Sequence, residues 1–249
     1  VLYRGDTLCV SSQVGCAVGC VFCASGQNGL GRALALRELI GQVEAVRSLG
    51  RELTRVTLSG VGEPLHNAGA AAAFLDYCRS QRLGLSLTTS GGPLPRLREW
   101  LRAPHNGLTL SVHAGSEPVR ARLMPHAPPL GAVFETLREE LPQLTQRRRK
   151  KTALAYLLIA GENDADEELQ AFCQRARPLG LRVHLYDYNR LPDGRYAGVD
   201  RARYEQVYMQ LSAAGLRVSM SSQARLEANG GCGTLRAARV ERRLELATE

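Results

Sequence analysis

Short runs rich in apolar and β-branched residues alternate along the chain with longer stretches whose apolar residues recur every three or four positions. The short runs predict strands and the longer stretches predict helices. The predicted strands are Thr7–Ser12, Arg55–Ser59, Leu85–Thr89, Leu108–Val112, Thr152–Ile159 and Arg182–Tyr188. The predicted helices are Leu34–Leu49, Ala70–Gln81, Leu94–Arg102, Gly131–Leu144, Asp164–Arg177 and Arg201–Ala214. Repeated strand-then-helix units predict an α/β fold with a parallel sheet and right-handed crossovers.

Polar segments directly follow several of the predicted strands, and they favour a barrel over a doubly wound sheet. These segments are Ser59–Pro64, Thr88–Gly91, Ser111–Ala114 and Tyr188–Arg190. In a (β/α) barrel such loops gather at one mouth, where active sites lie. The strand runs are nearly continuous in apolar residues, as expected when both faces of a sheet are covered. Six units fall short of a closed barrel of eight, so we expect an open, partial (β/α)6 barrel of the TIM type.

Composition and charge narrow the class of protein. The 249 residues are 44% hydrophobic and 22% charged, which excludes a disordered or collagen-like chain. The net charge of +8 comes from many arginines and only two lysines, and it favours a polyanionic partner such as nucleic acid. Aromatic residues make up only 5%, which argues against a module built on base-stacking platforms.

The hydropathy pattern contains no segment that predicts a membrane span or a secretory signal. The longest apolar stretch, near Ala153–Ala160, is far shorter than the ~20 residues that a spanning helix needs. Val1–Val10 does not combine a basic start with an apolar run. We therefore expect a cytoplasmic protein with no membrane partner. The two compositional breaks, Pro125–Pro129 and Gln146–Lys151, are predicted to be loops.

Three of the seven cysteines are closely spaced and carry the strongest chemical signal. Cys16, Cys20 and Cys23 lie within eight residues of one another, in a glycine-containing loop after the first strand. Soft thiolates at this spacing suit an iron–sulfur cluster or zinc. Three ligands on a four-iron cube leave one iron open to substrate, whereas a zinc knuckle needs a fourth ligand at short range. The nearest histidine, His66, lies 43 residues beyond Cys23, so we favour the cluster and retain structural zinc as the alternative.

The cysteine spacing and several sequence segments near it resemble those of a known family. A Cys-x3-Cys-x2-Cys loop before βα units, with an aromatic residue ahead of the last cysteine, resembles the radical SAM superfamily. Four segments resemble the RNA adenine-C2 methyltransferases of the RlmN/Cfr type. They are Thr7–Cys16, Gly62–Leu65 with Asn67, Ser111–Ala114 and Cys232–Leu235. The resemblance implies a [4Fe–4S] cluster held by the three cysteines, S-adenosylmethionine (SAM) bound to its open iron, and cleavage of SAM to a 5′-deoxyadenosyl radical.

The resemblance also implies roles for individual residues. Cys232 matches the cysteine that is methylated and then carries the methylene to the base, and Cys9 matches the cysteine that releases the product by forming a disulfide with it. Glu63, at the expected barrel mouth, is suited to accept hydrogen bonds from an ammonium group and matches the residue that binds the SAM amino group. The other matched cofactor-binding positions are Gly62, Thr88 in place of the usual Ser, Ser111, Val112 in place of Leu, His113, and Asn189 after Tyr188 in place of Trp.

Taken together, these observations predict that residues 1–249 form a radical SAM core domain with a C-terminal extension that carries Cys232. The resemblance implies a monomeric enzyme that methylates C2 of an adenine in rRNA or tRNA and takes electrons from a reductant such as flavodoxin or ferredoxin. We expect RNA phosphates to meet Arg236, Arg239, Arg242 and Arg243 rather than the basic run Arg147–Lys151, which should lie opposite the mouth.

Two departures from the family pattern leave other readings open. The family has a small N-terminal domain and an acidic residue upstream, whereas eight residues precede Cys9 here. The segment before Cys232, Ser221–Ala228, lacks the family's Thr-Arg-Gly-Asp character. The alternatives are a paralogue that methylates a different acceptor, a radical SAM enzyme that uses SAM only as an oxidant, and a non-catalytic metal-binding RNA adaptor.

Overall fold

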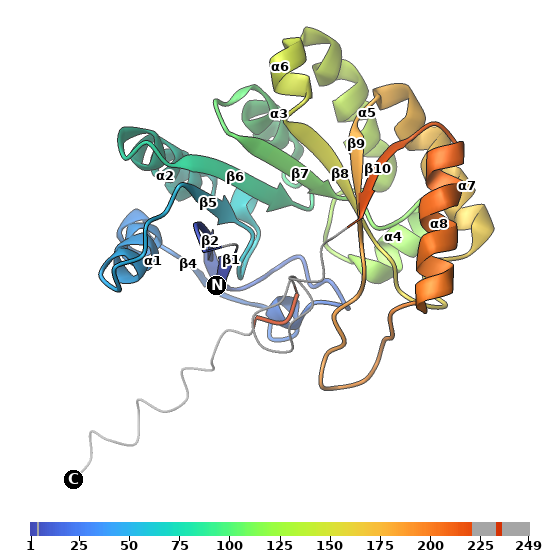
Figure 1. The fold of residues 1–249 in the computed structure, drawn as a ribbon, viewed down its shortest axis with the longest axis horizontal. Helices are drawn as coiled ribbons and strands as arrows, with labels where there is room; N and C mark the ends of the chain where they lie inside the picture. Colours follow the sequence, from blue (N-terminus) through green and yellow to red (C-terminus); the bar gives the residue numbers. More distant parts are fainter. Residues whose placement is uncertain (4, 221–232, 236–249) are drawn as a thin grey trace.

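The structure, a computed structural model, describes residues 1–3, 5–220 and 233–235, and it is built around one curved sheet (Figure 1). Its eight described strands lie in the order β1-β2-β5-β6-β7-β8-β9-β10. They are β1 (Leu2–Tyr3), β2 (Thr7–Val10), β5 (Arg55–Leu58), β6 (Gly84–Thr89), β7 (Gly107–Ser111), β8 (Thr152–Leu157), β9 (Arg182–Tyr186) and β10 (Arg217–Met220). Strand β1 is antiparallel to β2, and every other neighbouring pair is parallel.

The strand order confirms the partial barrel. Successive strands lie side by side without a reversal of winding, as in a (β/α) barrel, whereas a doubly wound sheet reverses at a switch point. The edge strands β1 and β10 pair with only one neighbour each among the described residues, so the barrel is open on that side. The seventh parallel strand, β10, was not predicted, because Arg217–Met220 is only partly buried and carries a weak apolar pattern.

Eight α-helices surround the sheet in the described part of the chain, with α6 at one end of the strands and α4 near the other (Figure 1). They are α1 (Leu36–Arg47), α2 (Ala68–Ser80), α3 (Leu94–Arg102), α4 (Glu117–Leu123), α5 (Leu130–Glu140), α6 (Gln146–Arg149), α7 (Asp166–Ala176) and α8 (Arg201–Ala213). The prediction missed α4 and wrongly assigned Gln146–Arg149 to a loop. Both helices are short, and α6 is started by the Thr145 side chain, which accepts a hydrogen bond from the Arg148 N–H at 3.3 Å. No described helix is both long and apolar enough to cross a bilayer.

The two faces of the sheet differ sharply, and this corrects the expectation of nearly continuous apolar strands. In β6 and β7, buried leucines alternate with half-buried Ser and Thr. The leucines point outward into one core beneath the helices, which includes Leu85, Leu87, Leu108 and Leu110, each at most 1% exposed. Because side chains alternate between faces of a strand, the hydroxyl-bearing residues point inward. The barrel interior is therefore a polar cavity and not a packed core.

Candidate functional site

A short hairpin holds the loop that carries the three closely spaced cysteines. Strands β3 (Gln13–Gly15) and β4 (Leu30–Ala33) pair antiparallel on either side of the loop. Gly15 adopts a φ of +77°, and a Cβ there would lie 2.0 Å from the Gly29 carbonyl oxygen, so the hairpin requires glycine at this position. The sequence analysis placed the loop directly after the first strand and missed this hairpin.

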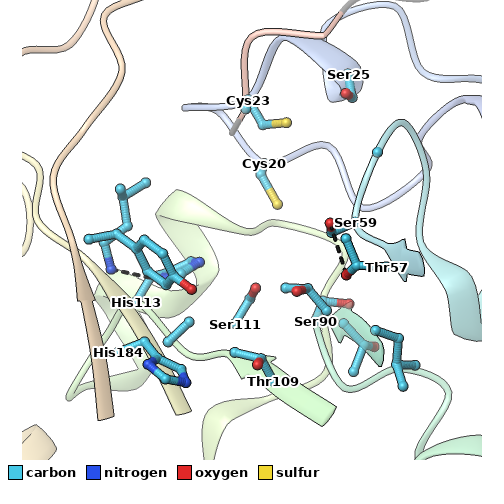
Figure 2. A pocket seen from close by; sticks show the side chains of 18 of the residues that line it. Cys20, Cys23, Ser25, Thr57, Ser59, Ser90, Thr109, Ser111, His113 and His184 are labelled. Atoms are coloured by element: carbon cyan, nitrogen blue, oxygen red, sulfur yellow. Dashed lines mark hydrogen bonds between the residues drawn. The ribbon is translucent and has the colours of Figure 1, made fainter. Parts of the chain in front are cut away.

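Apolar residues between the cysteines anchor the loop. Val18 and Phe22 are 2% and 8% exposed and pack in a small second core with Leu123, Met124 and Tyr188. The backbone N–H of Val21 also donates to the Leu123 carbonyl at 3.1 Å. These contacts fix the loop, and Cys16, Cys20 and Cys23 line a cavity next to them. Figure 2 shows the thiols of Cys20 and Cys23 above the space enclosed by the strand ends.

The surroundings of the cysteine loop favour neutral thiols in the absence of a metal. None of the three cysteines forms a disulfide with a described residue. Burial raises the pKa of Cys16 to about 11, and burial followed by the charges of Cys23 and Cys16 raises the pKa of Cys20 well above its usual range. Thiols that destabilise one another's charged form become thiolates readily when they coordinate a metal.

The spacing of the thiols bears on which metal group they fit. Among the described residues, no three His, Cys, Asp or Glu side chains converge closely enough to hold a single metal ion. A four-iron cube is wider than one ion, and each cysteine would bind a different iron. Three thiolates are a donor set that fits such a cluster, and Cys16, Cys20 and Cys23 would hold it.

Glu63 lies at the mouth of the same cavity and is 4% exposed. Its Oε1 accepts hydrogen bonds from the Leu65 N–H at 3.0 Å and the Thr89 hydroxyl at 2.6 Å, and its Oε2 accepts from the Ser90 N–H at 2.7 Å. A carboxylate can accept about four hydrogen bonds, so one position on Oε2 is left for a donor in the cavity. Every described hydrogen-bond partner of the carboxylate is neutral, and Arg120, whose charge interacts with Glu63, donates its hydrogen bonds to backbone carbonyls instead. The open position on Oε2 is therefore suited to a cationic donor.

Gly62 and Gln13 hold the backbone of Glu63 in place. Gly62 has a φ of +107°, and a Cβ there would lie 2.6 Å from the Cβ of Gln13. The Gln13 side-chain oxygen accepts a hydrogen bond from the Glu63 N–H at 2.8 Å. Glycine at this position is therefore required by the close packing of the two segments, in addition to any contact with a cofactor.

The cavity has a volume of about 700 Å³, within the range of small-molecule and cofactor sites. Of the predicted cofactor-binding residues, Gly62, Glu63, Thr88, Ser111, His113 and Asn189 line it. Val112 does not, because its side chain is 1% exposed and belongs to the outer core. Two lining residues, Ser90 and Tyr188, carry buried hydroxyls that make no hydrogen bond of normal geometry with the described residues. Orphaned polar groups of this kind indicate a site for a polar ligand such as SAM.

His113 adopts a left-handed backbone with a φ of 55°, which is uncommon outside glycine. Its Nδ1 accepts a hydrogen bond from the Leu157 N–H at 3.0 Å, and its ring packs edge-on against Phe22 at 5.3 Å. Burial, with a smaller effect of the Arg120 charge, lowers the pKa of His113 to about 3. The imidazole is therefore neutral at physiological pH and carries its proton on Nε2.

Arg120 is a buried cation behind the lining of the cavity, and the sequence analysis did not identify it. Its guanidinium is 2% exposed and donates to the carbonyls of Ser90, Ser111 and Val112 at 2.7, 2.6 and 2.8 Å. It thereby ties together the ends of β6 and β7. Burial lowers the pKa of Arg120 to about 10, while nearby Cys20, Glu117 and Glu63 raise it, so the group stays charged. This charge favours thiolates in the cysteine loop.

Thr89 and Ser90 were also missed as individual residues, although their segment was noted for following a strand. Both act through Glu63: the Thr89 hydroxyl and the Ser90 N–H each donate to its carboxylate. The only sequence signal was the run of hydroxyl residues before Gly91. Which of its members faces Glu63 depends on the register between β5 and β6.

Cys9 is 6% exposed and lies on the inner side of β2, level with Thr57 of β5. Its Sγ lies 3.3 Å from the Ser59 hydroxyl, within hydrogen-bond distance. Cys9 is not among the residues that line the cavity. A reaction between Cys9 and a thiol in the cavity therefore requires local rearrangement.

Cys232 lies outside the described residues, as do Ser221–Ala228 and Arg236, Arg239, Arg242 and Arg243. The residues that directly follow Cys232 are described and pack against the cysteine loop (Figure 1). The Gly233 carbonyl accepts a hydrogen bond from the Ala24 N–H at 2.8 Å, and the Leu235 carbonyl accepts one from the Ser25 hydroxyl at 2.8 Å. Gly233 also lines the cavity.

Comparisons with known proteins agree with this site. The profile of the radical SAM superfamily matches residues 10–173. A probable dual-specificity RNA methyltransferase RlmN from Parasynechococcus marenigrum is 35% identical over 244 residues, which cover 92% of this chain and 70% of that protein. A probable RNA methyltransferase from Stutzerimonas stutzeri is 33% identical over 249 residues, which cover 95% of this chain and 70% of that protein.

A solved structure extends the similarity to the whole described fold. The crystal structure of a radical SAM methyltransferase from Sphaerobacter thermophilus superimposes with a TM-score of 0.85 and 29% sequence identity. The match covers 96% of this chain and 72% of that chain. The matched region therefore includes the cysteine loop, the cavity and the strands that surround them.

Proposed function

Since the chain belongs to the radical SAM superfamily and, within it, to the RlmN-type RNA methyltransferases, we propose that it methylates C2 of an adenine in RNA through a methyl group carried on Cys232. The radical SAM family uses a [4Fe–4S] cluster and SAM. When bound, these cofactors supply the 5′-deoxyadenosyl radical and the methyl group. The carbon at C2 is not nucleophilic, so a direct polar transfer from SAM would not reach it.

The chain's own residues have separate tasks in this proposal. Cys16, Cys20 and Cys23 hold the cluster, and Glu63 accepts a hydrogen bond from the amino group of SAM. Ser90, Ser111 and Asn189 provide further polar contacts for SAM from the ends of successive strands. His113, neutral and protonated on Nε2, can donate a hydrogen bond into the cavity without adding charge. Arg120 positions the carbonyl ends of β6 and β7 beneath these groups.

The two remaining cysteines make and release the product. Cys232 accepts a methyl group on its sulfur and, once one hydrogen has been removed from it, presents the methylene to C2. The resulting thioether joins protein and RNA. Before release, the adduct loses the C2 hydrogen as a proton and gives its unpaired electron to the redox cofactor. Cys9 then attacks the sulfur of Cys232 as a thiolate, so that a disulfide forms, the carbon–sulfur bond breaks, and the released carbon takes up a proton to become the methyl group. Cys9 forms no disulfide with a described residue in the structure.

One observation carries the proposal. Gly233, the residue after Cys232, lines the same cavity as the three cluster cysteines and is hydrogen-bonded to Ala24, the residue after Cys23. Cys232 directly precedes this contact in the sequence, which supports the proposal that it works at the same cavity. On the same basis we propose that its partners are an RNA substrate and a flavodoxin- or ferredoxin-like reductant. We propose that residues 1–249 work as a monomer in the cytoplasm.

The proposal is tested by mass spectrometry of the reconstituted holoenzyme after incubation with SAM and reductant. We expect iron in the purified protein and one added methyl group on Cys232. Cys232→Ala should abolish the modification, and Cys173→Ala, a buried cysteine outside the site, should not. With RNA present, Cys9→Ala should accumulate a protein–RNA adduct that ribonuclease removes. Absence of the methyl group from Cys232, despite SAM cleavage, would overturn the proposal in favour of SAM used only as an oxidant.

A further inference from the structure

The inward-facing residues of the strands form a wall of hydrogen-bonding groups. The wall consists of Thr57, Ser86, Thr109, Ser111, His184 and Ser219, all half-buried and all lining the cavity. The corresponding positions of (β/α) barrels are usually filled by branched aliphatic residues that pack against one another. A row of hydroxyls in their place leaves room in the interior and requires polar partners there. We call this surface the inner wall; Figure 2 shows most of it.

Hydrogen bonds within the inner wall order its side chains in advance. His184 Nδ1 lies 2.7 Å from the Ser219 hydroxyl, and the Thr57 hydroxyl donates to Ser59 at 3.2 Å. Strand pairing places Ser219 opposite His184, and His184 opposite Ala155, whose side chain is small. An ordered pair of this kind loses little entropy when it binds a ligand.

The wall carries no charged side chain, which limits the class of ligand. In the described part of the chain, three residues of the charged types Asp, Glu, Lys and Arg line the cavity. They are Arg55, Glu63 and Asp187. Glu63 is engaged at the mouth, and Asp187 accepts a hydrogen bond from the Tyr188 N–H at 2.8 Å. Arg55 lies at the opposite end, where β5 begins. The middle of the interior therefore suits a neutral polar group and offers no counter-ion to a phosphate or an amine.

Aromatic rings stand beside these hydrogen-bonding groups. Tyr186 and Tyr188 line the cavity, and the ring of Tyr186 lies 6.3 Å from that of His184. Flat aromatic faces next to neutral donors and acceptors are the combination that recognises an unstacked nucleobase. A sugar would use the hydroxyls but would gain less from the rings.

The ligand site lies across the barrel from the strand that carries Thr88. Strand pairing places His184 and Ser219 level with Ser111, but on β9 and β10, which are three and four strands away from β6. The lining also reaches Leu2 on β1 and Met220 on β10, the two edge strands that are not paired with each other in the described part of the chain. Among the described residues the sheet is therefore open on the side where β9 and β10 lie.

We propose that the inner wall binds the acceptor nucleobase, with the His184–Ser219 pair hydrogen-bonding to its edge. This inference rests on the proposed function and adds to it the site and the chemistry by which the base is held. The acceptor is thereby held inside the barrel, beside the cofactor, and is recognised by neutral groups of β9 and β10.

Isothermal titration of the cluster-loaded protein tests the proposal. The cofactor site is first saturated with S-adenosylhomocysteine, so that its own adenine cannot be displaced, and adenosine is then titrated. We expect one adenosine per chain, bound about tenfold more weakly by His184→Phe and severalfold more weakly by Ser219→Ala, since each variant removes a neutral hydrogen bond. Matched controls are His66→Phe, on an exposed histidine, and Ser212→Ala, on α8.

The controls should bind adenosine like the parent, and all four variants should bind S-adenosylhomocysteine with unchanged affinity. Three outcomes would each overturn the proposal. The first is that adenosine fails to bind, the second is that the parent and both inner-wall variants bind adenosine with equal affinity, and the third is that ribose alone binds as tightly as adenosine. Ser219→Ala removes a single atom, so the test stands even where His184→Phe does not fold.

The outcomes also separate this proposal from the proposed function. Methylation of Cys232 needs SAM but no acceptor, so a methylated Cys232 without adenosine binding would overturn the inner-wall site alone. Adenosine binding that depends on His184, without methylation of Cys232, would support the site and overturn the reaction. Guanosine, cytidine and uridine are titrated in parallel. Tighter binding of one of these would support a nucleobase site and contradict adenine as the acceptor.

Discussion

The outer and inner faces of the same sheet carry different kinds of residue and have different tasks. On the outer face, residues such as Leu85, Leu110 and Val183 are fully buried beneath the helices, and they stabilise the fold by removing apolar surface from water. On the inner face, residues one position away, such as Ser86 and Thr109, surround a cavity. The comparison shows that stability and ligand binding are assigned to alternate residues of one strand, so they can be perturbed separately.

The same division applies to two buried carboxylates. Glu140, on α5 at the outer side, is 2% exposed and is paired with Arg98 and Arg102. Glu63, on the inner side, is 4% exposed and receives hydrogen bonds only from neutral groups among the described residues. A carboxylate that is hydrogen-bonded to its cations contributes to structure, whereas one that is hydrogen-bonded only to neutral groups can still bind a positively charged ligand.

The largest expected effect comes from substituting neighbouring residues on the two faces of β7. Leu110→Ala should lower the free energy of unfolding by about 3–5 kcal/mol, because it opens a cavity in a fully buried core. Thr109→Val should change it by less than about 1 kcal/mol, since the side chain faces the cavity and its volume is kept. Urea unfolding of both variants measures the difference. Equal losses of stability would contradict the division between the faces.

An acid-sensitive group lies on the outer side, away from the cavity. His105 is fully buried, and burial, aided by the charges of Arg148 and Lys151, lowers its pKa from 6.5 to about 4. The unfolded chain therefore takes up this proton first as pH falls, and stability is lost between about pH 6.5 and 4, by up to about 3 kcal/mol. His105→Phe keeps the ring and should remove this part of the pH dependence. The measurement is urea unfolding at pH 7 and pH 4.5, and an unchanged pH dependence in the variant would disprove the assignment.

The two buried glutamates provide a third test. Glu63→Gln should weaken SAM binding at least tenfold, about 1.4 kcal/mol or more, because the amide loses the charge and turns an N–H toward donors at Leu65 or Ser90. Glu140→Gln should destabilise the fold and leave SAM affinity unchanged. Equilibrium dialysis with SAM measures the first effect and thermal unfolding the second. If Glu140→Gln weakened SAM binding as much as Glu63→Gln, the two carboxylates would not have separate roles.

The smallest effect is expected from the basic run at the far end of the sheet. Helix α6 lies at the end of the molecule opposite the segment 233–235 that packs on the cysteine loop (Figure 1). Replacing Arg147 and Arg149 with Gln should therefore leave the salt dependence of RNA binding nearly unchanged, whereas replacing Arg236 and Arg239 should reduce its slope, by roughly 0.7 for each single-strand phosphate that is no longer neutralised. Filter binding at several salt concentrations provides the measurement. An equal reduction from both pairs would place RNA on both ends of the barrel.

Much of the fold was predictable because its signals are local. Six strands and six helices were placed within a few residues, since buried leucines and glycine or proline boundaries mark each of them. The elements that were missed have weak local signals. Strand β10 is only partly buried, and the hairpin β3–β4 has one strand fully exposed. These segments are strands because of the neighbours with which they pair, and pairing partners are not visible in a single sequence.

The sequence by itself determined the order of strands and helices, the cysteine triad and the positive charge, because each depends on the type and spacing of nearby residues. The tertiary structure alone decided what faces the cavity. Parallel register brings Ser90 to Glu63 from the next strand, 27 positions away, and Ser219 to His184 from 35 positions away. Such contacts form when strands distant in sequence pair side by side, and each strand's inward face is set by which of its sides the helices bury.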